Sequence, residues 1–307
     1  MTAVLKDIPA EEFRERLAAE GVRFHVGPYV YELRSALPSI LTGLQQLYGD
    51  YRLASAQGFA DFHVSMDASG IVQRLRGKVD FSFDFTQPLG IIERRHAYAF
   101  LEWGMNWCVS VFTNEYLKLH AAVVAKDGVA LVMPGLPGAG KSTLCAALAL
   151  RGWRVLSDEH ALIEVESAMA VPVCRPVSLK NASLDVIKAF DSRAIIGPQT
   201  DDTHKGVVAH MKADMHPDSH DITPVPVRLM IFPEYVSGLA LQITERTKAE
   251  SFIFAAHHSF NYSLLGEAGF RAMSSYMDAL ECFSLKYSSL DEAINAIDAL
   301  HARRSES

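Results

Sequence analysis

Hydrophobic and polar residues in the first third of the chain follow the periods of helices and strands in turn. Apolar spacing predicts helices over Ala10–Glu20 and from Pro38 to Gly49, with a strand over Val22–Tyr31 between them. Two further strands are expected at Asp61–Met66 and Gln73–Phe85, the second because aromatic residues alternate there with acidic ones. This mixture of short helices and half-buried strands is typical of an α+β domain.

A long apolar and aromatic stretch, His96–Leu119, has the spacing of a helix and opens a second region. From there to the C-terminus short apolar runs alternate with helical segments, as in a sheet covered by helices. A capping box at Ser289–Glu292 then precedes a last helix with a regular apolar face. The pattern predicts a small α+β domain over residues 1–95 and an α/β domain over residues 96–307.

Composition and charge narrow the class of protein. The 307 residues are 49% hydrophobic and 21% charged, which excludes intrinsic disorder and a disulfide scaffold. With 29 basic and 36 acidic residues the net charge is −7, so nucleic acid is not an expected partner. No apolar run approaches the length of a membrane span, and the first residues lack a signal-peptide pattern. We therefore expect a cytoplasmic protein without a membrane partner and with buried, reduced cysteines, and a homo-oligomer remains open.

The most specific motif follows a short apolar run, Val129–Met133, that predicts a buried strand. The next residues fit the GxxxxGKS pattern of a phosphate-binding loop, or P-loop, and a helix over Thr143–Leu150 follows at once. In this setting backbone N–H groups and the helix N-terminus face the phosphates of a nucleotide such as ATP. A glycine-rich turn that only caps a helix is the alternative. The expected nucleotide contacts are Gly135, Leu136, Pro137, Gly138, Ala139, Gly140, Lys141, Ser142 and Thr143.

An acidic pair follows the next predicted strand. Trp153–Ser157 runs into Asp158 and Glu159. Carboxylates at the end of a strand beside a P-loop can hold Mg²⁺ and can accept the proton of an attacking hydroxyl. We therefore expect Ser142, Asp158 and Glu159 to be Mg²⁺ ligands and Asp158 to be catalytic. The alternative is that both acids only cap a turn and face solvent.

Two cations further along the chain are candidates for stabilising charge on the transferred phosphoryl group. Lys205 lies next to Gly206 in a polar stretch, and a mobile loop there could close on the γ-phosphate. A solvated polar loop fits the same residues equally well. Arg228, which precedes the apolar strand Leu229–Phe232, is the second candidate.

Together these residues resemble the catalytic domain of HPr kinase/phosphorylase, a bacterial P-loop serine kinase. The resemblance implies an α/β fold related to that of ATP-dependent phosphoenolpyruvate carboxykinase. It also implies that Asp158 accepts the seryl proton, that Glu159 helps to hold Mg²⁺ and that His120 lies near the transferred phosphoryl group. Without the resemblance, a histidine at this position would more often be a structural one. The matching residues are His120, Gly128, Gly135–Ser142, Arg151, Gly152, Arg154, Asp158 and Glu159.

The part of the sequence after the acidic pair departs from that family. Its later signature is not recognisable, and Arg175–Asn181 and Gly197–Met211 stand in its place. These segments resemble the HPr-kinase-related subgroup, some of whose members phosphorylate precursor peptides. The resemblance therefore implies an ATP-dependent kinase that acts on a serine-type hydroxyl of a protein or peptide other than HPr. A small-molecule kinase and an ATP-gated binding or regulatory module with little turnover are the alternatives.

Overall fold

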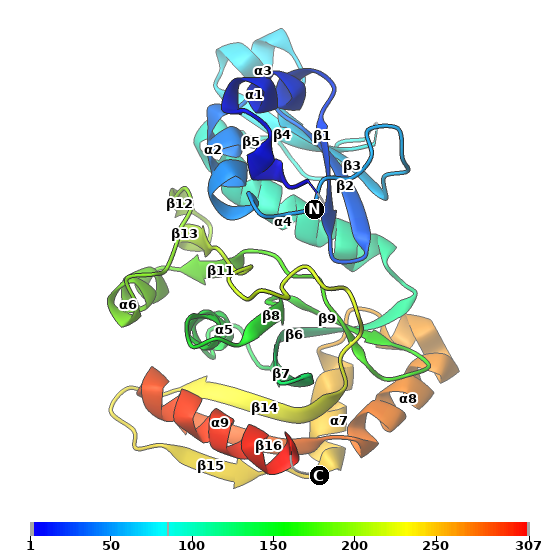
Figure 1. Ribbon diagram of the computed structural model, residues 1–307, viewed down its shortest axis with the longest axis vertical. Helices are drawn as coiled ribbons and strands as arrows, with labels where there is room; N and C mark the ends of the chain where they lie inside the picture. The colour runs from blue at the N-terminus through cyan, green and yellow to red at the C-terminus, as the bar shows by residue number, and fades with distance from the viewer. Residues whose placement is uncertain (1–2, 85, 306–307) are drawn as a thin grey trace. The chain divides into compact units, whose positions relative to one another are not determined.

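The protein has a mixed α/β fold with several sheets (Figure 1). The computed structural model describes residues 3–84 and 86–305. The chain divides into two compact units. The first unit contains the residues up to Val109 together with Ser178–Lys212, and the second contains Ser110–Val177 and the residues from Ala213 onward. The domain boundary expected near residue 95 stays a prediction.

The first unit is built on a five-stranded sheet with the order β1-β2-β3-β4-β5. Strand β2 pairs parallel with β3, and the other neighbours pair antiparallel. The strands are β1 (Val22–Val26), β2 (Tyr29–Arg34), β3 (Phe62–Asp67), β4 (Lys78–Phe83) and β5 (Ile92–Glu93). The helices are α1 (Ala10–Ala19), α2 (Pro38–Leu47), α3 (Ile71–Leu75) and α4 (Ala97–Phe112), with 3-10 turns at Leu5–Asp7 and Arg94–His96.

The two helices predicted in this region are confirmed as α1 and α2, but two strand predictions need correction. The single strand predicted over Val22–Tyr31 is a hairpin of β1 and β2, because Gly27 takes a positive φ of 59° and turns the chain before Pro28. The strand predicted from Gln73 begins only at Lys78, since α3 extends to Leu75 and Gly77 takes a positive φ of 63° before the strand starts. Residue 85, the last of that prediction, lies outside the described residues.

The long helix predicted over His96–Leu119 is also too long. Helix α4 ends at Phe112, and from Tyr116 the chain forms strand β6 (Tyr116–Lys126). Residues 116–120 pair with strand β9 (His160–Glu164), which lies about forty residues later in the sequence. Such long-range pairing overrides the helical spacing of a local apolar stretch.

Residues 178–212 form a small sheet that packs within the first unit. Its order is β11-β13-β12, and Lys212 at its end pairs with Asp50, whose Oδ2 lies 2.6 Å from Nζ. Arg95 contacts Asp202 at 2.8 Å, and the ring of His210 lies 6.0 Å from that of Tyr98. The elements are β11 (Val177–Lys180), α6 (Ala182–Phe190), β12 (Thr200–Thr203) and β13 (Gly206–Met211).

The second unit contains an eight-stranded sheet with the order β10-β9-β6-β7-β14-β16-β15, and β8 pairs with β6. Three neighbouring strands, β7, β14 and β16, are parallel. The remaining strands are β7 (Val129–Pro134), β8 (Arg154–Ser157), β10 (Ala170–Val171), β14 (Val227–Tyr235), β15 (Gln242–Glu245) and β16 (Glu281–Tyr287). The helices are α5 (Lys141–Leu150), α7 (Lys248–His257), α8 (Tyr262–Asp278) and α9 (Leu290–Ser305).

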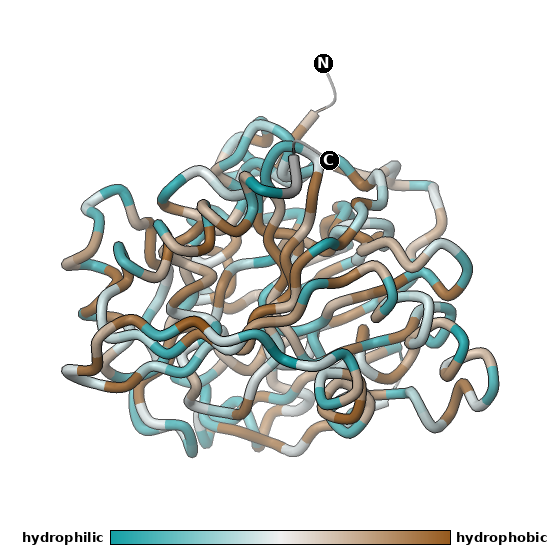
Figure 2. The backbone as a smooth tube through the Cα atoms, turned by 90° about the horizontal axis from the view of Figure 1, so that it is seen from below, coloured by the Kyte–Doolittle hydropathy of each residue, from teal (hydrophilic) through white to brown (hydrophobic). Residues whose placement is uncertain are grey.

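Helices cover both faces of this sheet, and β6 shows which residues face which helices. Its odd-numbered residues share a core with α7 and α8. Because side chains alternate along a strand, the even-numbered residues, His120 among them, face the other side, where α5 contacts β6 and α9. Hydrophobic segments lie mostly inside and hydrophilic ones mostly in outer loops (Figure 2). All four cysteines are buried.

Candidate functional site

The P-loop joins the carboxyl end of β7 to the first residue of α5, as the sequence predicts. The Ala139 N–H donates to the Leu136 carbonyl at 3.2 Å, which closes a turn within the loop. The Leu144 N–H donates to the Gly140 carbonyl at 2.9 Å and begins the helical ladder. The first N–H groups of a helix have no earlier carbonyl partner in it, so they can receive an anion.

Lys141 is folded back into the concave side of the loop. Its side chain is buried, and Nζ donates to the carbonyl oxygens of Gly135 at 2.7 Å and Leu136 at 3.2 Å. These neutral acceptors hold the ammonium group inside the loop. A phosphate is a stronger partner for the same ammonium group, because a phosphate carries a negative charge and the backbone carbonyls do not.

Two loop glycines are required by the backbone. Gly138 and Gly140 have φ values of 85° and 93°, in the left-handed region that L-residues avoid. An added Cβ on Gly138 would meet nothing within 4 Å, whereas one on Gly140 would lie 2.8 Å from the Tyr287 hydroxyl oxygen. The loop conformation therefore depends on glycine at both positions, and Gly140 is also closely packed.

The acidic pair lies at the same edge of the sheet as the P-loop. Strand β6 separates β7 from β8 and pairs antiparallel with both, so β7 and β8 point the same way. Pro134, at the end of β7, is opposite Ala121, and Ser157, at the end of β8, is opposite Val123. Asp158 and the start of the P-loop therefore lie on either side of the same strand.

Asp158 is buried beside the P-loop helix. Only 6% of the residue is exposed. Burial raises the pKa of the Cys145 thiol well above its usual value, and the nearby Asp158 carboxylate raises it further. Cys145 is about one helical turn after Lys141 in α5. The interpretation of Asp158 as a merely solvated acid is therefore wrong.

Glu159 and His120 contact each other at the same edge. His120 Nε2 lies 3.2 Å from Glu159 Oε2, and both side chains are about two-thirds buried, with 31% and 29% exposed. His120 is the residue before Ala121 in β6, so it is level with the first residue of the P-loop. The structure thus brings His120, Asp158, Glu159 and the P-loop together, while their chemical roles stay predictions.

A polar cluster that was not predicted from the sequence lies next to this contact, and its His160 and Lys118 are buried. Ser110 Oγ lies 2.6 Å from His160 Nε2, and Lys118 Nζ donates to the Ser110 carbonyl at 2.6 Å and to Asn114 Oδ1 at 3.1 Å. Burial lowers the pKa of His160 to about 3 and that of Lys118 to about 8. His160 is therefore neutral near pH 7. The contacts of Ser110 and Lys118 cannot be predicted from the sequence, because the apolar spacing up to Leu119 predicts one continuous helix.

Two tyrosines that were not predicted as site residues also flank the loop. Tyr235 and Tyr287 end the parallel strands β14 and β16, and their ring centroids are 5.9 Å apart in an edge-to-face arrangement. The Tyr235 N–H donates to the Ala139 carbonyl at 3.2 Å. Their only sequence signal is a tyrosine at the end of each apolar run, and this pattern does not identify a P-loop contact.

Lys205 lies in the first unit, at the exposed turn between β12 and β13. This turn is a tight hairpin, not an open loop. Asn181 Nδ2 donates to the Lys205 carbonyl at 3.1 Å, and Thr203 Oγ1 donates to the Gly206 carbonyl at 2.6 Å. The action of Lys205 on a γ-phosphate stays a prediction, because the P-loop belongs to the second unit.

Arg228 is not brought to the site edge. It is exposed and is the second residue of β14. The P-loop follows the carboxyl end of β7, and β14 runs parallel to β7. Arg228 is therefore at the amino end of its strand, on the opposite edge of the sheet from the P-loop.

The residues at this edge fit a Mg²⁺ ion that binds together with a nucleotide. Among residues 3–84 and 86–305, no group of three or more His, Cys, Asp or Glu side chains could hold a metal. Nucleotide-bound Mg²⁺ needs only one or two protein oxygens, because phosphates and waters supply the rest. The half-buried Ser142 in the first turn of α5 and the buried Asp158 beside that helix carry oxygen atoms of this kind. Glu159 adds a second carboxylate.

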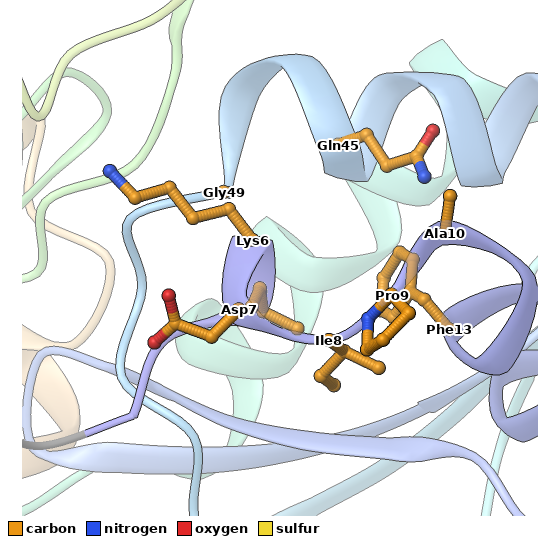
Figure 3. A pocket seen from close by; sticks show the side chains of 9 residues that line it. Lys6, Asp7, Ile8, Pro9, Ala10, Phe13, Gln45 and Gly49 are labelled. Atoms are coloured by element: carbon orange, nitrogen blue, oxygen red, sulfur yellow. The ribbon is translucent and has the colours of Figure 1, made fainter.

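Two cavities of about 340 Å³ lie in the first unit. Figure 3 shows one of them, with Pro9, Phe13 and Gln45 around it. The other lies against Leu17 and Pro38. Neither contains a predicted catalytic residue.

Comparisons with known proteins do not define a family. The sequence matches no protein-family model, and no curated protein matches it. Among solved structures, the HPr(Ser) kinase/phosphatase from Coxiella burnetii is similar over 62% of this chain and 97% of its own, with 12% identity and a TM-score of 0.30. This similarity is at most distant, so we base the functional interpretation on the residues of this chain. In the described part of the chain, no helix is both long and apolar enough to span a membrane.

Proposed function

We propose that this protein is a kinase that binds ATP at Gly135–Thr143 and transfers the γ-phosphoryl group to a serine-type hydroxyl of a protein or peptide. The observation that carries the proposal is the buried Asp158 beside α5, at the same edge of the sheet as the P-loop. A site that only binds nucleotide does not need a proton acceptor at this position. Phosphoryl transfer to a hydroxyl does, because the hydroxyl must lose its proton.

The position of each residue indicates its role in the proposed reaction. Lys141 leaves the carbonyls of its own loop and neutralises phosphate charge, while the N–H groups of the loop fix the phosphate chain. Ser142, Asp158 and Glu159 hold Mg²⁺, which supplies further neutralisation of the phosphates when bound. His120 is positioned by Glu159 and faces the start of the loop.

In the proposed transfer one bond forms, one bond breaks and one proton moves, and ADP is the leaving group. The acceptor oxygen forms a bond to the γ-phosphorus, and the bond from that phosphorus to the β–γ bridging oxygen breaks. The proton of the acceptor hydroxyl passes to Asp158. The serine-type acceptor rests on the sequence resemblance, and a small-molecule acceptor would use the same chemistry.

The test compares ATP binding with turnover. Asp158→Asn should still bind Mg²⁺-ATP in calorimetry but lose at least about a hundredfold in phosphoryl transfer from γ-³²P-ATP to a library of seryl peptides. Asp278→Asn, at the exposed end of α8, is the matched control and should keep the wild-type rate. A turnover above about a tenth of wild type in Asp158→Asn would exclude Asp158 as the base. Labelling only of metabolites, or of HPr, would change the proposed acceptor.

A further inference from the structure

The carboxyl ends of three parallel strands form one side of the P-loop. Strand β14 lies beside β7 and is followed by β16, and Tyr235 pairs in register with Tyr287 at the ends of these two strands. Binding sites in sheets of parallel strands form outside the carboxyl ends of the strands. A ligand held by the P-loop can therefore extend toward the ends of β14 and β16.

The two tyrosines contact the loop in different ways. Tyr287 is 1% exposed, and its hydroxyl oxygen lies 2.8 Å from the position that a Cβ on Gly140 would take. Burial raises the pKa of this phenol and so favours its neutral, protonated form. Tyr235 is 54% exposed, although its backbone N–H is bound to Ala139 and its Cβ lies against Gly140. Tyr287 therefore supports the loop, whereas Tyr235 holds an aromatic ring beside the loop with much of its surface open.

The position of the acids gives the direction of a bound triphosphate. Asp158 and Glu159 lie on the β6 side of β7, and Tyr235 lies on the β14 side. The γ-phosphate must be next to the proton acceptor for transfer to occur. The α-phosphate and the nucleoside attached to it must then extend away from the acids, toward β14.

We propose that the ring of Tyr235 stacks on the base of the bound nucleotide and anchors the nucleoside end of ATP. This inference rests on the proposed function, because it takes the direction of the triphosphate from the role of Asp158. An exposed aromatic ring with a fixed backbone offers a flat apolar surface at low entropic cost. Stacking of one base on an aromatic side chain contributes about 1–3 kcal/mol and does not depend on which base is present, because every base has a π-face.

The experiment uses calorimetry, in the presence of Mg²⁺, to measure the binding of two probes. The probes are ATP and inorganic tripolyphosphate. Tyr235→Ala should raise the dissociation constant for ATP by about 5- to 150-fold, the range found when stacked aromatic residues are truncated. The dissociation constant for tripolyphosphate, which has no base, should change less than twofold. Tyr235→Phe keeps the ring and should bind ATP like the wild type. Phe270→Ala, which removes a 55% exposed ring from α8, is the matched control.

The outcomes separate this inference from the proposed function. If Tyr235→Ala lowers the affinity for both probes equally, Tyr235 supports the loop and does not stack on the base. If the affinity for both probes is unchanged, Tyr235 makes no contact with the nucleotide. Either result overturns the stacking proposal. If wild-type protein binds both probes and Tyr235→Ala behaves as expected but no phosphoryl group is transferred, the kinase assignment fails and the base contact stands. If wild-type protein binds neither probe, both fail.

Discussion

Replacement of Gly140 by alanine tests the packing of the P-loop against β16. Gly138→Ala is a matched control, because the two glycines have nearly the same backbone conformation, with φ values of 85° and 93°. They differ in their surroundings. The new Cβ is in open space at position 138, but at position 140 it lies 2.8 Å from the hydroxyl oxygen of Tyr287. Any difference between the variants therefore measures this contact.

Two contributions determine the expected loss in the free energy of unfolding: the left-handed backbone and the contact with Tyr287. A left-handed backbone costs an L-residue about 1–2 kcal/mol, so Gly138→Ala should lower the free energy of unfolding by that amount. Forcing a methyl group into a packed site costs about 1–3 kcal/mol more, which gives Gly140→Ala a total of about 2–5 kcal/mol. Tyr287→Phe removes the clashing oxygen and leaves the ring carbon Cζ at 3.8 Å from the new Cβ. The double variant should therefore regain about 1–3 kcal/mol.

The assay is urea unfolding followed by circular dichroism, with the Tyr287→Phe single variant to complete the double-mutant cycle. The dissociation constant for Mg²⁺-ATP is measured on the same four proteins. It should rise in Gly140→Ala and recover in the double variant, because the loop returns to its shape. Equal destabilisation by Gly138→Ala and Gly140→Ala, or no recovery with Tyr287→Phe, would refute this account of the loop.

Three further predictions concern single side chains. Lys141→Ala should weaken ATP binding at least tenfold and abolish transfer, because no other cation is expected within the loop; unchanged affinity in calorimetry would count against it. Lys205→Ala should slow single-turnover transfer with little change in ATP affinity, and an unaltered chemical step would leave this hairpin without a catalytic role. Burial lowers the pKa of His160 from 6.5 to about 3 in the folded protein. Between these two pH values the unfolded chain binds more protons at this residue than the folded protein does, so the free energy of unfolding decreases as the pH falls. His160→Gln should lose less stability than wild type from pH 6.5 to 4 in thermal melts, and parallel curves would contradict this.

The parts of the site that could be predicted from sequence are those fixed by neighbouring residues. The turn at Gly138 and Gly140 needs a left-handed backbone, and the first turn of α5 follows directly, so the P-loop is visible in a short sequence window. The acidic pair was predicted for a similar reason, because it ends a clear apolar strand. In contrast, the helix prediction over His96–Leu119 failed where β6 begins, since pairing with β9 decides that conformation.

The same distinction explains why the tyrosines and the exact place of the acids could not be predicted. A strand, a P-loop helix and a second strand suggest two adjacent parallel strands. Here β6, which precedes β7 in the chain, lies between β7 and β8 and pairs antiparallel with both. Asp158 therefore lies on the side of β7 where His120 and Ala121 of β6 are. Strands β14 and β16 lie on the opposite side of β7. The strand order thus determines which side of the loop receives the acids and which receives the tyrosines. The residues proposed to contact phosphate are adjacent in the sequence, whereas the proposed direction of the nucleotide depends on strand pairings between distant residues.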